Sequence, residues 1–263
     1  MDLGLKGKVA VVMASSSGIG QGIAMVLAQE GCAMALCARG RERLDAVAST
    51  LRESSASPVF AMPADVSDMA SLDKFFNSVF DEYGKVDILV TNAGGPPQGR
   101  CLEFGDEPYV AAFNLTLMSV VRSCRRVVPS MVERGWGRIV NVASTSVKCA
   151  LENMVLSNVF RSGVAAFSKT LSMEYAHQGI RVHTIMSGPF MTNRVNELGA
   201  SAARQKGITF DQWKKEAEAG TTLGRFGNPL EFGALVAFLV SERSDYMTGT
   251  CIAIDGGALK TIA

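Results

Sequence analysis

The sequence predicts an α/β fold in which one doubly wound, parallel sheet of seven strands carries helices on both faces. Two observations support this prediction. Short apolar runs alternate with longer stretches of helical periodicity along the chain, which is the pattern of βαβ units with right-handed crossovers. The apolar runs also lack the polar/apolar alternation of a half-exposed strand, so we expect each strand to be covered on both faces.

Taken in order, the elements fit this scheme. The predicted strands are residues 8–14, 32–38, 57–63, 85–91, 137–143, 180–186 and 250–256. The run "GIAMVLAQEG" after the first strand reads as a helix that stops at a glycine, and "RERLDAVASTL" follows the second strand as an amphipathic helix. We find no repeat or linker, and therefore expect a single domain over residues 1–263, with a polar, helical excursion at about 192–223.

Composition narrows the possible functions. The chain of 263 residues has a net charge of +1, which gives no electrostatic reason to expect binding to nucleic acid or to an anionic membrane. No apolar run approaches the length of a membrane span, and the first is too short for a signal peptide. Six scattered cysteines without a CxxC pair indicate reduced thiols in the cytoplasm. With only two histidines, we expect no metal site.

The first strand leads into "ASSSGIGQGIA", residues 14–24, at the start of the first helix. Gly18 and Gly20 let the backbone approach a phosphate closely, and the free N–H groups of a helix start favour an anion. Because the loop joins the first strand and helix of a βαβ unit, it favours a dinucleotide site. Tight packing of helix against strand is the alternative.

The end of the second strand indicates which dinucleotide binds. A site for NAD usually carries an acid there, which holds the ribose 2′-hydroxyl, whereas this chain has Ala38 followed by Arg39. Arginine suits a 2′-phosphate, so we expect NADP, with NADPH preferred over NADH. The alternative, a solvated helix start, fits Arg43 better than Arg39.

Several motifs, in order, resemble the short-chain dehydrogenase/reductase family, and in particular its 3-oxoacyl-(acyl-carrier-protein) reductases. They are "SSSGIG" (15–20), "ADV" (64–66), "TNAGG" (91–95), "FNLT" (113–116), "RIVNVAS" (138–144), "GIRVHTIMSGPFMT" (179–192) and "LGRFGNPLEFGALVAFLVSERSDYMTGTCIAIDGG" (223–257). The resemblance covers nearly the whole chain. It implies a Rossmann-like fold, a nicotinamide cofactor, a small-molecule substrate and a homotetramer or homodimer built on the long helices after the fourth and fifth strands.

The resemblance also implies roles for particular residues. Its cofactor residues are Ser15, Ser17, Gly18, Ile19, Gly20, Asp65, Val66, Asn92, Ala93, Gly94, Gly188 and Thr192. In the family these positions run from the pyrophosphate loop through the adenine and the ribose to the nicotinamide. The catalytic asparagine matches Asn114 and the catalytic serine matches Ser144.

Three departures bear on the chemistry. Met13-Ala14 replaces the usual Thr-Gly, Ser187-Gly188 replaces Pro-Gly, and Ser157 and Arg161 stand where the family has Tyr-x-x-x-Lys. The family tyrosine gives a proton to the carbonyl oxygen, and the lysine binds the nicotinamide ribose. General acid catalysis contributes roughly 10²- to 10⁴-fold, so its loss slows reduction without forbidding it. Arg161 can still reach ribose hydroxyls, but it cannot act as a base.

Three proton sources remain open: Lys148, which we rank first, Glu152, and a water held by Ser144 and Ser157. Arg100, Arg194 and Lys148 could also form a cationic mouth for an anionic substrate.

We therefore expect an NADP(H)-dependent oxidoreductase that reduces a carbonyl or oxidises the corresponding alcohol, with Asn114, Ser144, Ser157, Arg161 and Lys148 as catalytic candidates. The alternatives are a nucleotide-binding module without turnover, and a lyase or isomerase on the same scaffold.

Overall fold

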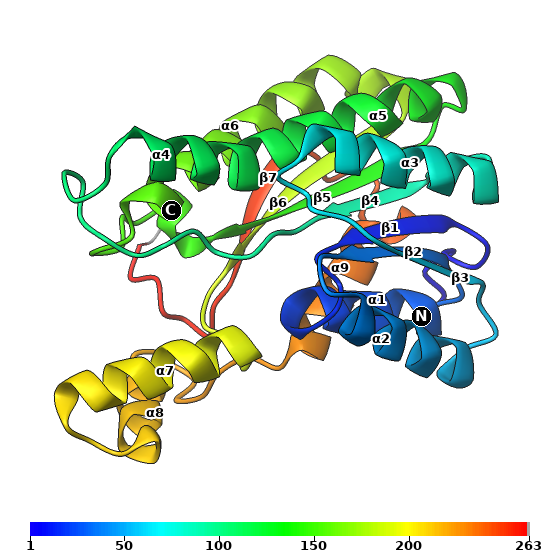
Figure 1. Ribbon diagram of the computed structural model, residues 1–263. Helices are drawn as coiled ribbons and strands as arrows, with labels where there is room; N and C mark the ends of the chain where they lie inside the picture. The colour runs from blue at the N-terminus through cyan, green and yellow to red at the C-terminus, as the bar shows by residue number, and fades with distance from the viewer. Residues whose placement is uncertain (262–263) are drawn as a thin grey trace.

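The computed structural model describes residues 1–261, apart from the side chain of Arg194, and Figure 1 shows its layers. It confirms the seven strands in one parallel sheet of order β3-β2-β1-β4-β5-β6-β7. The strands are β1 (Val9–Met13), β2 (Ala33–Ala38), β3 (Val59–Pro63), β4 (Ile88–Thr91), β5 (Gly137–Ser144), β6 (Ile180–Ser187) and β7 (Thr250–Ile254). The strand order reverses between β1 and β4, where an α/β sheet opens a crevice at its carboxyl edge.

Helices cover both faces of the sheet, as predicted. They are α1 (Gly18–Gln29), α2 (Arg41–Ser54), α3 (Met69–Tyr83), α4 (Asp106–Ala112), α5 (Ser119–Glu133), α6 (Val155–Tyr175), α7 (Asn193–Lys206), α8 (Phe210–Ala219) and α9 (Pro229–Leu239), with a π-helix η1 (Phe113–Met118) and short 3₁₀ turns η2 (Thr145–Val147), η3 (Ala176–Gln178) and η4 (Glu242–Ser244). In Figure 1, α1, α2 and α9 lie on one face, and α3, α5 and α6 on the other. None of the helices within residues 1–261 is long and apolar enough to cross a membrane.

The continuous apolar strands supply two cores. In β1, Ala10 and Val12 belong to the core under α1, α2 and α9, whereas Val11 and Met13 belong to the core under α3, α5 and α6. Alternate side chains of a strand point to opposite faces, and both faces are buried here. This explains why these strands carry no polar alternation.

Close packing of α1 against α9 fixes the direction of α1. A Cβ atom added at Gly233 of α9 would lie 2.6 Å from the carbonyl oxygen of Gly22 in α1, closer than side chains tolerate. The glycine therefore lets the two helices touch through their backbones. The start of α1 is thereby held at the carboxyl end of β1.

The polar segment at about 192–223 forms α7 and α8, which Figure 1 places apart from both helix layers. Aromatic packing supports this excursion. The rings of Phe210 and Trp213 in α8 have centroids 5.6 Å apart, and Trp213 lies 6.2 Å from the ring of Phe226. These aromatic contacts pack α8 against the segment that contains Phe226.

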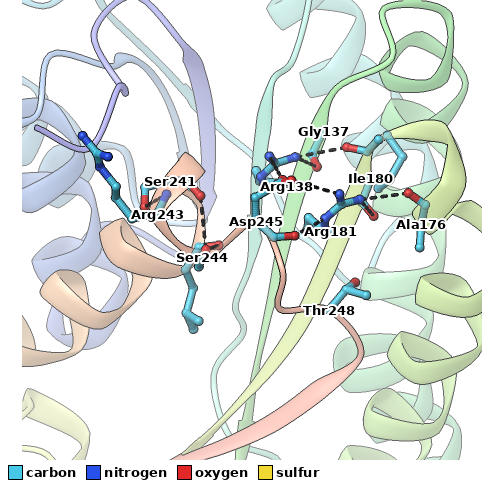
Figure 2. Close-up of polar contacts among 12 residues, drawn as sticks. Gly137, Arg138, Ala176, Ile180, Arg181, Ser241, Arg243, Ser244, Asp245 and Thr248 are labelled. Atoms are coloured by element: carbon cyan, nitrogen blue, oxygen red, sulfur yellow. Dashed lines mark hydrogen bonds and ion pairs between the residues drawn. The ribbon is translucent and has the colours of Figure 1, made fainter.

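The amino ends of β5 and β6 carry an ion cluster, shown in Figure 2. Asp245, in the chain leading to β7, accepts hydrogen bonds from Arg138 at 2.8 Å and from Arg181 at 3.2 Å. The Arg138 side chain is only 3% exposed, and its guanidinium carbon lies 4.3 Å from the centre of the Trp136 ring. The cluster ties three strand starts together at the edge opposite the crevice.

Candidate active site

The larger cavity, of about 540 Å³, lies at the carboxyl ends of β1, β2 and β4. Of the expected cofactor residues, those that line it are Ser17, Gly18, Ile19, Arg39, Asp65, Val66, Asn92, Ala93, Gly94 and Thr192. Ser15 and Gly20 do not line the cavity. Ser15 is fully buried and donates its N–H to the carbonyl of Cys37, and Gly20 packs against the backbone of Ala14.

The start of α1 is prepared for an anion. Ser17 is the N-cap of this helix, its side chain makes no capping hydrogen bond, and the first turn holds no acid. The first N–H groups are thus available to a ligand. Ala14, which replaces the glycine of the family, has φ of +49°, a left-handed conformation that is uncommon for a residue with a Cβ atom. The chain keeps the glycine-type loop geometry although the glycine is absent.

The lining of this cavity also contains two arginines and an acid. Arg39 and Arg43 are exposed and both line the cavity. Arg43 also lies in the first turn of α2, so its exposure is compatible with the solvated helix start that the sequence offered as the alternative. Burial acts to raise the pKa of Asp65, but hydrogen bonds from Ser67 and the charge of Arg39 outweigh it, so that pKa lies below its usual value. The two guanidinium groups suit a phosphorylated ribose.

A second cavity, of about 240 Å³, adjoins the first and shares Ile19, Asn92, Ala93 and Gly95 with it. It brings together Ser144 at the end of β5, Ser157 and Arg161 of α6, and Gly188 after β6. Walls that the sequence did not indicate come from Pro96, Gln98, Met154 and Leu198. These residues lie in loops and in α7, where the sequence pattern does not indicate which side chains point into the cavity.

The hydroxyl of Ser144 retains a proton to donate. Its oxygen accepts the N–H of Ser146 at 3.2 Å, so its own O–H is free to point into the cavity. Ser157, in α6, is 3% exposed and lines the same cavity as Ser144. Two hydroxyls thus face one space.

Arg161 is the single charged residue among the described side chains that line the second cavity. It donates a hydrogen bond to the carbonyl oxygen of Val142 at 3.3 Å, and no carboxylate among the described residues forms an ion pair with it. Burial lowers the pKa of Arg161 to about 10, so the group stays charged at neutral pH. This cation is poised to meet an acceptor that enters the cavity.

Asn114 does not line either cavity. It lies in the π-helix η1, where its amide donates to the carbonyl of Val110 at 3.1 Å and accepts from Arg122 at 2.9 Å. Arg122 also donates to the carbonyl of Ser67 at 3.0 Å. The Asn114 amide is therefore engaged within the continuous run of α4, η1 and α5, and its expected catalytic role stays a prediction.

The structure also leaves other candidates away from the second cavity. Lys148, Glu152 and Arg100 are exposed, and none of them contributes to the lining. The side chain of Arg194 lies outside the described part of the structure. Within residues 1–261, no group of three or more His, Cys, Asp or Glu side chains could hold a metal ion.

Comparison with known proteins agrees with this geometry. The family model described as enoyl-(acyl carrier protein) reductase matches residues 13–258. A putative ketoacyl reductase of Streptomyces coelicolor is 32% identical, with 95% of this chain and 96% of the relative covered. The 3-oxoacyl-(acyl-carrier-protein) reductase FabG of Thermotoga maritima is 31% identical, with 96% and 98% covered.

Solved structures show the same likeness. The crystal structure of L-sorbose reductase from Gluconobacter frateurii, complexed with NADPH and L-sorbose, is 35% identical with a TM-score of 0.96, and both chains are fully covered. A variant of actinorhodin polyketide ketoreductase with NADPH is 30% identical with a TM-score of 0.92, covering 97% of this chain and 98% of that one. Fold and site together thus define an oxidoreductase of the Rossmann-like class. The chain belongs to the short-chain dehydrogenase/reductase family, on its 3-oxoacyl-(acyl-carrier-protein) reductase-like side, as its motifs indicated.

Proposed function

We propose that this protein is an NADPH-dependent reductase of a small, polar oxo compound, with an atypical route for the proton. One observation carries the proposal: a cavity lined by the start of α1, with its free N–H groups, and by Arg39 and Arg43 adjoins a second cavity lined by Ser144, Ser157 and Arg161. The first suits a dinucleotide phosphorylated on its adenine ribose. The second suits the group being reduced.

Residues of this chain would hold the cofactor from end to end. Asp65 and Val66 would lie at the adenine, the start of α1 would take the pyrophosphate, and Asn92 and Gly188 would flank the nicotinamide half. When bound, NADPH supplies the hydride. The protein positions the substrate and stabilises the charge that develops on its oxygen.

The two serines and Arg161 perform that stabilisation. The free O–H of Ser144 donates to the carbonyl oxygen, and the guanidinium of Arg161 offers further N–H donors beside it. As hydride adds to the carbonyl carbon, the oxygen takes a proton from a water that is hydrogen-bonded to Ser144 and Ser157. Bulk solvent replaces that proton. This route is favoured over Lys148 because Lys148 lies outside the cavity lining.

The second cavity also supports an anionic substrate. Among the residues that the structure describes, its lining contains the unpaired cation Arg161 and no acid, so a carboxylate near the reacting carbonyl would find a planar, two-pronged partner. The relatives named above act on ketoacyl compounds or on L-sorbose. A neutral polyhydroxy ketone is therefore the second substrate class to test.

A homotetramer or homodimer is supported by apolar side chains on the helices after β4 and β5. Val110 of α4, Phe113 of η1 and Val159 of α6 are 57%, 38% and 50% exposed. Phe160 packs against Tyr109 and Phe113, which joins these helices into one surface. All six cysteines are free thiols, which supports the proposed cytoplasmic location.

The test is calorimetric titration with NADPH and with NADH, on the wild type and on Arg39→Ala. We expect micromolar binding of NADPH that weakens roughly 10- to 100-fold in the variant, because about 1.5–3 kcal/mol of charge-assisted hydrogen bonding is lost. NADH affinity should stay unchanged. Arg41→Ala is the matched control, since Arg41 also opens α2 and does not line the cavity.

Turnover is then measured as NADPH oxidation with acetoacetate, pyruvate and L-sorbose. Failure to bind either nucleotide would refute the proposal. Binding without oxidation of NADPH by any oxo compound favours the nucleotide-binding module, and substrate conversion without net oxidation favours the lyase or isomerase.

A further inference from the structure

The side chain of Asn158 is tied to the loop that follows β5. Its Oδ1 accepts the N–H of Leu151 at 3.2 Å, and its Nδ2 donates to the carbonyl of Leu151 at 2.9 Å. One amide side chain thereby satisfies both backbone groups of one loop residue, as a neighbouring strand would. Asn158 also donates its own N–H to the carbonyl of Met154 at 2.9 Å. Loop 148–154 is thus held to the first turn of α6.

Loop 148–154 in turn makes backbone hydrogen bonds to a second loop, residues 95–104. Gly99, in the segment after β4, donates its N–H to the carbonyl of Asn153 at 2.7 Å, and its carbonyl accepts from Val155 at 3.5 Å. Gly99 and Met154 form an isolated parallel bridge. A Cβ atom at Gly99 would lie 2.5 Å from the Phe104 ring, so the backbone fits closely at this bridge. Loop 95–104 consequently depends on loop 148–154 for its position.

The residues of these two loops that line a cavity belong to the second cavity alone, with the exception of Gly95. Pro96 and Gln98 from one loop and Met154 from the other line the second cavity and not the first. Gly95 lines both cavities. A change in the position of these loops would therefore alter the space for substrate while leaving most of the dinucleotide site intact.

We propose that Asn158 is a positioning residue that holds loops 95–104 and 148–154 together, and that this brace sets the affinity for substrate without setting the affinity for NADPH. Asn158 follows Ser157 directly on α6, but it belongs to neither cavity lining. It acts through Leu151 and Met154. The brace joins the serine that faces the cavity to both loops that enclose it.

Hydrogen exchange followed by mass spectrometry tests the brace without any substrate. In Asn158→Leu, which keeps the side-chain size and removes both hydrogen bonds, we expect amides in loops 95–104 and 148–154 to exchange roughly 10- to 100-fold faster. Thr170→Val is the matched control, because Thr170 lies on the same helix and its side chain donates a hydrogen bond to the carbonyl of Ala166, within that helix. It should leave both loops unchanged.

Asn158→Asp is the second variant, used in case the leucine variant does not fold. Its carboxylate can accept from Leu151 but cannot donate to the Leu151 carbonyl, so exchange should again accelerate in both loops. Unchanged exchange in a folded variant, or equal acceleration in Thr170→Val, would overturn the proposal. Acceleration in loop 148–154 alone would overturn the coupling of the two loops.

A functional measurement separates a brace for substrate from a general structural role. With L-sorbose or acetoacetate as the probe, KM should rise roughly tenfold or more in Asn158→Leu, while the Kd for NADPH stays within about twofold of the wild type. A parallel loss of NADPH affinity would overturn the selective role. The choice of loops as the substrate side rests on the proposed reductase function. If the wild type shows no turnover while the loops of Asn158→Leu still exchange faster, the proposed function is refuted and the brace is retained.

Discussion

Removing the acid shared by Arg138 and Arg181 should destabilise the fold measurably. The Asp245 carboxylate is 52% exposed, whereas the Arg138 side chain is 3% exposed. In Asp245→Asn the side chain keeps its shape and loses the charge that faces both guanidinium groups. Arg138 then remains a nearly buried cation whose Nε already has no hydrogen-bond partner among the described residues.

The magnitude follows from the burial of each partner. Breaking a fully buried pair costs about 3–5 kcal/mol, and a fully exposed pair contributes about 0–1 kcal/mol. Arg138 keeps the carbonyls of Gly137 and Gly179, and Arg181 keeps those of Ala176 and of Asp245 itself. We therefore expect a loss of about 1–3 kcal/mol. For a chain of this size, that corresponds to a Tm lower by roughly 3–10 °C.

Urea unfolding and thermal unfolding at pH 7 measure this effect. Glu216→Gln is the control, because the Lys206–Glu216 pair is more than half exposed on both sides and its loss should fall within about 0.5 kcal/mol. A loss for Asp245→Asn no larger than that of the control would refute the reasoning. It would mean that the backbone carbonyls alone satisfy the buried guanidinium.

Three further outcomes are expected. Burial and neighbouring guanidinium groups lower the pKa of His183 from 6.5 to about 4; the unfolded chain therefore binds this proton first, and stability should fall by up to roughly 3 kcal/mol between pH 6.5 and 4. Urea unfolding across that range should show a smaller slope in His183→Gln, and an equal slope would contradict the assignment. The double variant Ser157→Tyr, Arg161→Lys should raise kcat for NADPH oxidation roughly 10²- to 10⁴-fold, and a rate no higher than that of the wild type would show that proton transfer does not limit turnover. Val159→Glu should shift sedimentation toward smaller species, and an unchanged oligomer would place the interface elsewhere.

The sequence predicted the sheet well because its strands are buried on both faces. A run such as Val9–Met13 has no polar residue to confuse its assignment, and the glycine-rich loop follows it directly. The same reasoning predicted that the loop after β1 and the end of β2 lie close together, because helix starts and strand ends are fixed by local signals. Gly18 and Arg39 both line the larger cavity.

The direction of polar side chains could not be predicted in the same way. Asn114 turns its amide toward Val110 and Arg122 because a π-helix rotates it there, and nothing in "FNLT" indicates that helix type. Lys148 is exposed because the turn after β5 aims it outward. The bond between Asn158 and Leu151 depends on the path of a loop, which has no periodic pattern.

The cluster of Arg138, Arg181 and Asp245 stands at one edge of the sheet, and the two cavities stand at the other. This separation has a consequence for descent. Because the ion cluster lies at the amino ends of the strands, residues at their carboxyl ends can be substituted during evolution without loss of the interactions that hold the cluster together. Ser157 and Arg161 lie at the carboxyl ends of the strands, in the lining of the second cavity. On the function proposed above, the chain has changed how it moves a proton and has kept the scaffold of its family.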